Sequence, residues 1–210
     1  MFERLLEWTP HLAGGFAINI GISALAMAVG TLIGVGLGRM RRARLRLARP
    51  TASGLTSAAR NIPSFVLMFY VAYLIPVEIA WNGIIVEIPT WLKATLALTF
   101  PAVGFASDQY MGYGRQRDAG SRSASRMFWT AWTQYFLIVL MASATASVIG
   151  ADEVVGRANR LIATDNRPGF MVAVYAYVSV WFLLSGMIIS RYGPTLAEAI
   201  TARRTQRVTC

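Results

Sequence analysis

Five long apolar runs, separated by arginine-rich or turn-like segments, constrain this chain more than any other feature. They cover residues of about 12–38, 61–81, 91–110, 127–150 and 169–190. A helix rises about 1.5 Å per residue, so about 20 apolar residues cross the roughly 30 Å of hydrocarbon in a bilayer. Only 14% of the residues are charged, against about a quarter in soluble domains. The sequence therefore predicts an all-α integral membrane protein with five transmembrane helices, forming a single transmembrane domain over residues 1–210.

The run over residues 91–110 is the weakest of the five. Lys93 lies near its start and Pro101 in its middle. A lysine at a helix end can extend its ammonium to the membrane surface, and neighbouring helices can satisfy the backbone that a proline frees. Asp108 lies near the other end of the run, where we expect an acid at the membrane interface; a role in transport is the alternative.

The arginines between the runs predict the orientation. Segments 39–60, 111–126 and 191–210 hold seven, four and four of them, which indicates cytoplasmic loops. The N-terminus is then periplasmic and the C-terminus cytoplasmic. This clustering also argues that the net charge of +10 serves topology and does not bind nucleic acid. Segment 39–49 is expected to determine topology, and binding to anionic membrane lipids or to an ATPase is the alternative.

Residues for catalysis or metal binding are not evident. The single cysteine is the last residue, Cys210, and the sequence has no phosphate-binding loop, zinc-ligand spacing or nucleophile elbow. We expect no catalytic residue, no metal and no cofactor. Gly30, Gly34 and Gly38 recur at four-residue spacing in the first run and predict a ridge for close helix packing, although glycine is also common in membrane helices.

Two segments resemble the membrane subunits of polar amino acid ABC transporters. "RNIPSFVLMFYVAYLIP" (60–76) resembles the start of that family's second span, with Arg60, Pro63 and Pro76 matching its motif. "ATASVIG" (144–150) and the acidic, helix-like stretch after it resemble the end of its fourth span. The resemblance implies an outer gate formed by Ser147, Val148, Ile149 and Gly150.

The same resemblance implies a type I ABC-importer permease fold in the bacterial inner membrane. It implies three protein partners, namely ATP-binding subunits, a second permease subunit (identical or homologous) and an extracytoplasmic solute-binding protein. It also implies contact with membrane lipids. ATP hydrolysis would take place on the ATP-binding partner.

The chain departs from the family pattern between the third and fourth spans. The family has a long loop there that forms a helix coupling the permease to its ATPase, whereas this chain has a loop shorter by about twenty residues. Candidates for a reduced coupling loop are Arg115, Arg117, Asp118, Arg122 and Arg126. Polar positions of the family's transport path are occupied by Leu67, Met141 and Ala142. Two hypotheses follow: a divergent permease subunit paired with a fuller homologue, or a degenerate permease that is a structural or regulatory subunit of another membrane complex.

Overall fold

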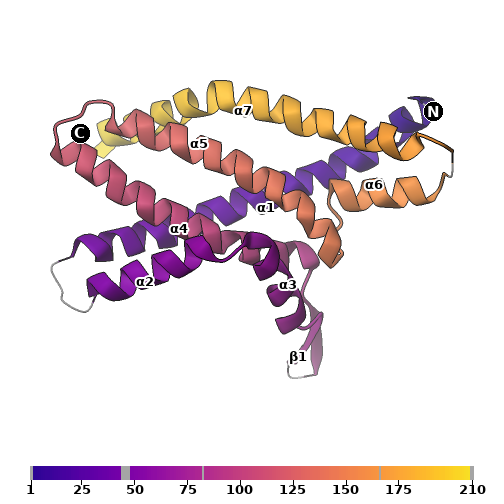
Figure 1. The fold of residues 1–210 in the computed structure, drawn as a ribbon, viewed down its shortest axis with the longest axis horizontal. Coiled ribbons are helices and arrows are strands. Elements are labelled where there is room, and N and C mark those ends of the chain that lie inside the picture. Colours follow the sequence, from indigo (N-terminus) through magenta and orange to yellow (C-terminus); the bar gives the residue numbers. More distant parts are fainter. Residues whose placement is uncertain (1, 44–47, 82, 166, 209–210) are drawn as a thin grey trace.

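The computed structural model describes residues 2–43, 48–81, 83–165 and 167–208, and it is mostly helical (Figure 1). Arg44 and Arg46 of the basic segment, and Cys210, lie outside the described residues. The element order is α1 (Phe2–Arg42), α2 (Ala48–Asn61), α3 (Ser64–Leu74), β1 (Glu78–Trp81), β2 (Ile84–Glu87), α4 (Thr90–Asp118), α5 (Ala124–Ser143), the 3-10 helix η1 (Ala144–Ile149), α6 (Val154–Ala163) and α7 (Phe170–Val208).

Helix α1 packs along α4, and three glycines of α1 make this close packing possible. A Cβ atom would lie 2.5 Å from Ala102 Cβ at Gly30, 2.5 Å from the Val103 carbonyl at Gly34 and 2.7 Å from the Tyr110 ring at Gly38. Real Cβ atoms do not approach other atoms so closely, so any larger residue would push the two helices apart. The predicted glycine ridge is therefore occupied within the chain itself, and it is not a free surface for another protein.

Two prolines divide the second apolar run. Pro63 has an extended backbone and separates α2 from α3, while Ile75, which precedes Pro76, is extended and ends α3. The predicted span 61–81 is thus wrong as one helix. It contains an 11-residue helix of about 16 Å, too short to cross the hydrocarbon, followed by strand β1.

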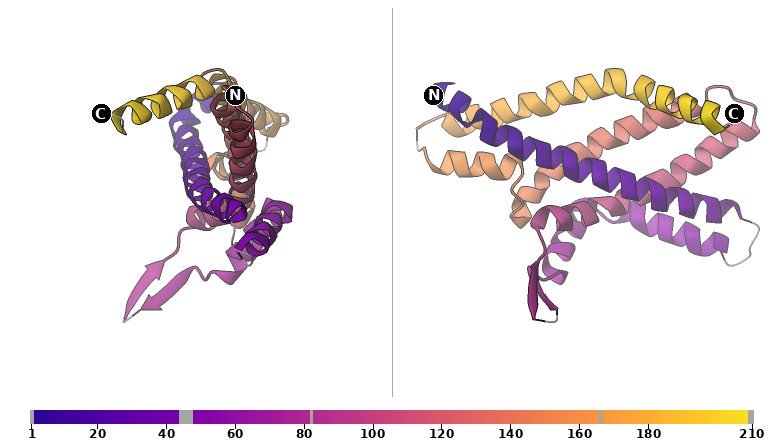
Figure 2. Two further views of the ribbon diagram at one scale, coloured as in Figure 1. Left: turned by 90° about the vertical axis from the view of Figure 1, so that its left-hand side faces the viewer. Right: turned by 180° about the vertical axis from the view of Figure 1, so that it is seen from behind.

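Strands β1 and β2 form an antiparallel hairpin that projects away from the helices (Figure 2). The pairing places Glu78 opposite Glu87 and Ile79 opposite Val86. Gly83, in the connecting turn, has a φ of 80°, a conformation that favours glycine.

In the described part of the chain, three helical stretches are long and apolar enough to cross a membrane: Glu3–Arg42, Ala124–Ile149 and Phe170–Thr195. They contain the predicted spans 12–38, 127–150 and 169–190 to within one residue. The predicted span 91–110 lies inside α4, which has 29 residues but does not reach the same apolar composition. Lys93 does not extend to the surface as expected: its side chain is buried, and Nζ donates a 2.8 Å hydrogen bond to the Ile75 carbonyl at the end of α3.

The two ends of the molecule differ in the elements that form them (Figures 1 and 2). At the basic end lie the C-terminal turns of α1 and α4 and the start of α5. At the opposite end, called the α6 end, the start of α1 lies beside α6 and the start of α7. One apolar core joins α1, α3, α4, α5 and η1, and a second joins α1, α6 and α7.

Candidate functional site: the turn from η1 into α6

The small-residue segment after α5 forms a helix end followed by a sharp turn. Residues Ala144–Ile149 tighten into the 3-10 helix η1, and Gly150 follows with a φ of 84°. The Gly150 amide donates to the Ser147 carbonyl at 3.0 Å, and the Ala151 amide donates to the Ala146 carbonyl at 3.0 Å. This left-handed glycine reverses the chain, as at many helix C-termini. The predicted gate residues therefore build the turn: Ser147, Val148 and Ile149 belong to η1, and Gly150 ends it.

Helix α6 is short and amphipathic, and one face of it is buried. Val154, Ala158 and Leu161 recur at helical spacing and have no appreciable exposure. They pack with Leu12 of α1 and Phe170 of α7 in the second apolar core. Burial of this face attaches α6 to the first half of α1 and to the start of α7.

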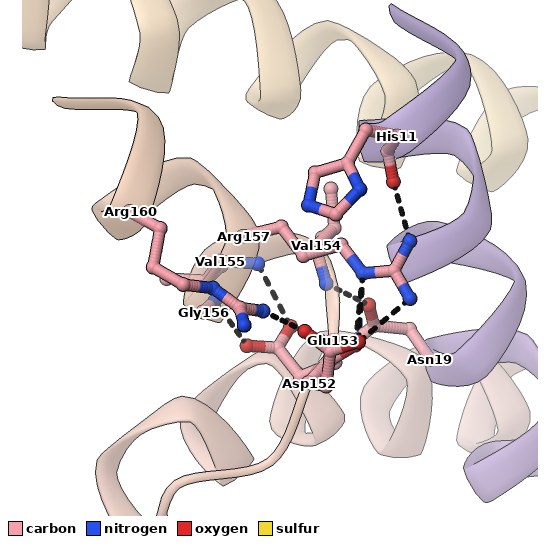
Figure 3. A network of polar contacts seen from close by, with 9 residues as sticks. All are labelled: His11, Asn19, Asp152, Glu153, Val154, Val155, Gly156, Arg157 and Arg160. Atoms are coloured by element: carbon pink, nitrogen blue, oxygen red, sulfur yellow. Dashed lines mark hydrogen bonds and ion pairs between the residues drawn. The ribbon is translucent and has the colours of Figure 1, made fainter. Parts of the chain in front are cut away.

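Glu153 is the N-cap of α6, and its carboxylate is fully buried (Figure 3). Oε1 accepts a hydrogen bond from the Gly156 amide at 2.8 Å, and Oε2 accepts one from the Val155 amide at 3.0 Å. These bonds satisfy amides in the first turn that have no partner within the helix. Oε2 also accepts a 2.9 Å hydrogen bond from Asn19 Nδ2 of α1.

Asn19 joins three elements through one buried amide group. Its Nδ2 donates to Ser143 Oγ at 2.9 Å and to Glu153, and its Oδ1 accepts from the Val154 amide at 3.1 Å. Ser143 is the last residue of α5, so Asn19 connects α1 to the residues on both sides of the turn. Asn19, Ser143 and Glu153 are all inaccessible to solvent. Such a satisfied, buried network fixes one relative position of the elements that it joins.

Opposing effects act on the pKa of Glu153. Burial raises the pKa because it disfavours the charged form, whereas the hydrogen bonds from Val155, Asn19 and Gly156 lower it. Burial is the larger effect, so the pKa lies above its ordinary value.

Arg157 forms a second attachment of α6 to α1. Its Nη1 donates to the His11 carbonyl at 2.6 Å, and its Nη2 lies 2.7 Å from Asp152 Oδ2 (Figure 3). Gly14 and Gly15 leave the space for this contact: a Cβ would lie 2.6 Å from Arg157 Nη1 at Gly14 and 2.8 Å from Val154 Cα at Gly15.

An ion pair also joins α1 to the connection between α6 and α7. Arg4 Nη1 lies 2.7 Å from Asp165 Oδ2. The Arg167 guanidinium hydrogen-bonds to the same carboxylate and is the main reason that the pKa of Asp165 lies well below its usual range. The α6 end is thus held together by polar contacts and by the apolar face of α6.

A different polar cluster lies toward the basic end. Asp108 of α4 accepts from Arg41 Nη1 at 2.7 Å through Oδ1 and from Arg60 Nη1 at 2.7 Å through Oδ2. Beside it, Ser107 Oγ lies 2.9 Å from Thr56 Oγ1. Asp108 thus bridges α1, α2 and α4, ten residues before the end of α4, and is not an isolated acid at a helix end.

Arg60 and Pro63 do not begin a span: Arg60 lies in the last turn of α2, and Pro63 lies between α2 and α3.

The α4–α5 connection contains no separate helix. It consists of residues 119–123, all of them described, and Gly120 has a φ of 75°. The five residues predicted to form a reduced coupling loop are divided among three places. Arg115, Arg117 and Asp118 lie in the last turn of α4, Arg122 lies in the connection, and Arg126 lies in the first turn of α5. Asp118 pairs with Arg42 of α1 at 2.6 Å.

Sequence reasoning did not identify Asn19 or the role of Glu153. A signal for Asn19 exists, because it is an amide in an otherwise apolar run, and polar residues in such runs usually contact other polar groups. The partners of Asn19 lie 124 and 134 residues away, so its contacts cannot be derived from spacing along the chain. The described residues hold no group of three or more His, Cys, Asp or Glu side chains placed to bind a metal.

Comparisons with solved structures identify the fold. A chain in the crystal structure of an amino acid ABC transporter with histidines matches with a TM-score of 0.72 and 18% identity, covering 97% of this chain and 98% of that one. A chain in inward-facing structures of the MetNI methionine ABC transporter matches with a TM-score of 0.63 and 16% identity, covering 92% and 98%. No protein-family model matches the sequence, and no curated protein does. The fold is that of an ABC transporter membrane subunit.

Proposed function

We propose that this chain is a membrane-spanning permease subunit of an ABC importer for amino acids or related small polar solutes. The observation that carries the proposal is the similarity of fold over 97% of the chain to a chain of an amino acid ABC transporter. A second similar chain comes from a methionine ABC transporter, which supports the same class of solute. The subunit is non-catalytic in this proposal, and ATP hydrolysis takes place on a partner.

The proposed orientation places the α6 end outside and the basic end in the cytoplasm of a bacterial inner membrane. The exposed arginines at the basic end support it, because cytoplasmic segments are enriched in arginine and lysine. ATP-binding subunits then contact the basic end, and an extracytoplasmic solute-binding protein approaches α6. A second permease subunit, identical or homologous, completes the transport path.

In this proposal the turn from η1 into α6 is the outer gate. Its buried network supports that role, since Asn19 holds α6 and the end of α5 to one helix. An outer gate built in this way moves together with the first half of α1. Movement of α1 against α4 at their glycine contacts would transmit a change at the basic end to the gate.

The α4–α5 connection favours a second candidate function. Five residues without a helix offer little surface for coupling to an ATPase. A degenerate permease-like subunit with a structural or regulatory role in another membrane complex is therefore the alternative proposal. A fuller homologous partner that carries the coupling helix is the arrangement that retains transport.

Affinity purification of the tagged full chain from its native membrane in mild detergent, followed by mass spectrometry, tests the proposal. We expect an ATP-binding subunit and a second permease at stoichiometric amounts. Arg122→Glu in the α4–α5 connection should lower the amount of ATP-binding subunit recovered with the chain, while Arg4→Glu at the α6 end should not. Purification of an unrelated membrane complex without an ATPase would overturn the permease proposal and support the alternative.

A further inference from the structure

A small aromatic cavity lies between α1, α4 and α5 at the basic end. Its volume is about 230 Å³, and its lining residues are Val35, Tyr110, Tyr113, Ser125, Phe128 and Trp129. Ser125 is exposed, so the cavity opens at the surface. The rings contact one another edge to face, with centroids 6.0 Å apart for Tyr113 and Phe128 and 5.3 Å apart for Phe128 and Trp129. The volume suits a headgroup-sized ligand, since pockets for drug-sized molecules begin at about 300 Å³.

An unpaired cation lies beside this cavity. Arg39 Cζ is 5.9 Å from the centre of the Tyr110 ring, and Arg39 has no ion pair among the described residues. Among the side chains that the structure describes at the basic end, the carboxylates are Asp108, which Arg41 and Arg60 neutralise, and Asp118, which pairs with Arg42. Four further exposed arginines without an ion pair in the described part of the chain surround the same end: Arg115, Arg117, Arg122 and Arg126. The end of the molecule at which the cavity opens is therefore strongly positive.

The cavity also lies near the ends of two long apolar stretches, and the ends of helices that cross a membrane meet the lipid headgroups. Val35 is near the end of the apolar stretch Glu3–Arg42, and Trp129 is near the start of Ala124–Ile149. On the membrane side, Trp132 Nε1 donates a 2.9 Å hydrogen bond to Thr31 Oγ1 and joins α1 to α5. Aromatic side chains gather at this depth of a membrane, and basic pockets between helices there bind anionic headgroups.

We propose that this cavity binds the headgroup of an anionic phospholipid. Arg39 contacts the phosphate, and the Ser125 hydroxyl donates to a phosphate oxygen. The four rings surround the glycerol and the first acyl carbons. Leu32, 76% exposed and about one helical turn before Val35, offers an apolar surface along which an acyl chain continues. Lipid binding at this place does not require that the chain transports a solute.

A lipid explains the cavity better than free phosphate does. The walls are mainly aromatic, whereas a site for an inorganic anion is formed by several polar donors. In this cavity the described donors are the hydroxyls of Tyr110, Tyr113 and Ser125 and the indole N–H of Trp129, together with Arg39 at the mouth. The combination of one cation with a large apolar wall matches an amphipathic ligand.

The fluorescence of Trp129 provides a direct test. The full chain is placed in phosphatidylcholine nanodiscs that contain either brominated phosphatidylglycerol or brominated phosphatidylcholine at equal mole fraction. The part of the quenching that disappears in Trp129→Phe belongs to the cavity. When the mole fraction of brominated lipid is increased stepwise, we expect this part of the quenching to appear at a several-fold lower fraction of phosphatidylglycerol than of phosphatidylcholine.

Two variants separate the site from general attraction to a charged membrane. Arg39→Gln should weaken the preference for phosphatidylglycerol about fivefold, whereas Arg49→Gln, an equal loss of charge at an exposed position of α2, should change it little. Ser125→Phe, at an exposed position, fills the cavity and should abolish the Trp129 quenching by both lipids. The proposal would be overturned by equal quenching by both lipids or by equal effects of Arg39→Gln and Arg49→Gln. It would also be overturned if Ser125→Phe had no effect, or if inorganic phosphate displaced the lipid.

Discussion

Replacement of Asn19 by alanine gives the most direct measure of what holds α6 in place. The change removes both hydrogen bonds from Nδ2 and leaves the buried Val154 amide without its acceptor. A buried donor without a partner costs about 1–3 kcal/mol, and a hydrogen bond to a charged group contributes about 1.5–3 kcal/mol. We therefore expect the free energy of opening of α6 to fall by about 3–5 kcal/mol.

Hydrogen exchange with mass spectrometry of the chain in detergent measures this opening directly. A tenfold change in exchange corresponds to about 1.4 kcal/mol, so the amides of the first turn of α6 should exchange about 150 to 5,000 times faster in Asn19→Ala. Asn61→Ala is the matched control, because Asn61 is exposed and bonds within its own helix to Ser57. Its effect on α6 should be negligible.

An isosteric variant separates the two sides of the Asn19 amide. Asn19→Asp keeps the acceptor for the Val154 amide but places a carboxylate against Glu153, so α6 should open more easily as the pH rises. An increase in exchange of less than tenfold in Asn19→Ala, or one equal to that of Asn61→Ala, would refute the reasoning.

Three further predictions follow from burial, charge and contact distances. Because burial raises the pKa of Glu153, ionisation of Glu153 destabilises the fold. We expect α6 to be most stable below the ordinary glutamate pKa of about 4.3 and to lose stability as the pH rises through the raised pKa. Asp165 at the same end has a lowered pKa and contributes a slope of the opposite sign at acidic pH, so the part due to Glu153 is the difference in slope between the native chain and Glu153→Gln, measured by hydrogen exchange. A difference of the opposite sign contradicts the assignment. Asp108→Asn leaves two arginines without their counter-ion and should lower the unfolding free energy by about 1–2 kcal/mol. Asp118→Asn removes a more exposed pair and should lower it by less than about 0.5 kcal/mol. Equal losses of unfolding free energy in denaturant titrations would argue against a bridging role for Asp108. Gly34→Ala should lower the unfolding free energy by about 1–3 kcal/mol, because the added methyl group overpacks against α4. Gly36 has open space around it, so Gly36→Ala should raise the unfolding free energy by about 0.5–1 kcal/mol. Changes of the same sign in the two variants would contradict the packing of α1 on α4.

The limits of the second apolar run show where sequence reasoning failed. The composition of residues 61–81 satisfies the requirement for a span, but two prolines restrict the residues before them and confine the helix to Ser64–Leu74. Pro63 and Pro76 match a family motif, but that match does not show that they confine the helix between them. Hydropathy averages over a window, whereas helix continuity depends on the backbone of single residues, so the average could not show the breaks.

The small-residue turn shows what sequence reasoning achieved. The segment before α6 was predicted to end a span, and the structure places the end of the helix there, at Gly150 with its positive φ. The sequence also indicated helix packing at Gly30, Gly34 and Gly38 without naming the partner. Only the structure identifies that partner as α4 of the same chain.

By itself the sequence determined the membrane class and the approximate limits of three spans, including the end of the span before α6. These depend on composition, periodicity and single backbone conformations, all of which are local. The tertiary structure alone decided that Asn19 meets Glu153 and that Asp108 meets Arg41 and Arg60. Such contacts join residues about 50 to 134 positions apart, and a buried polar group gains its partner only when helices pack in one register.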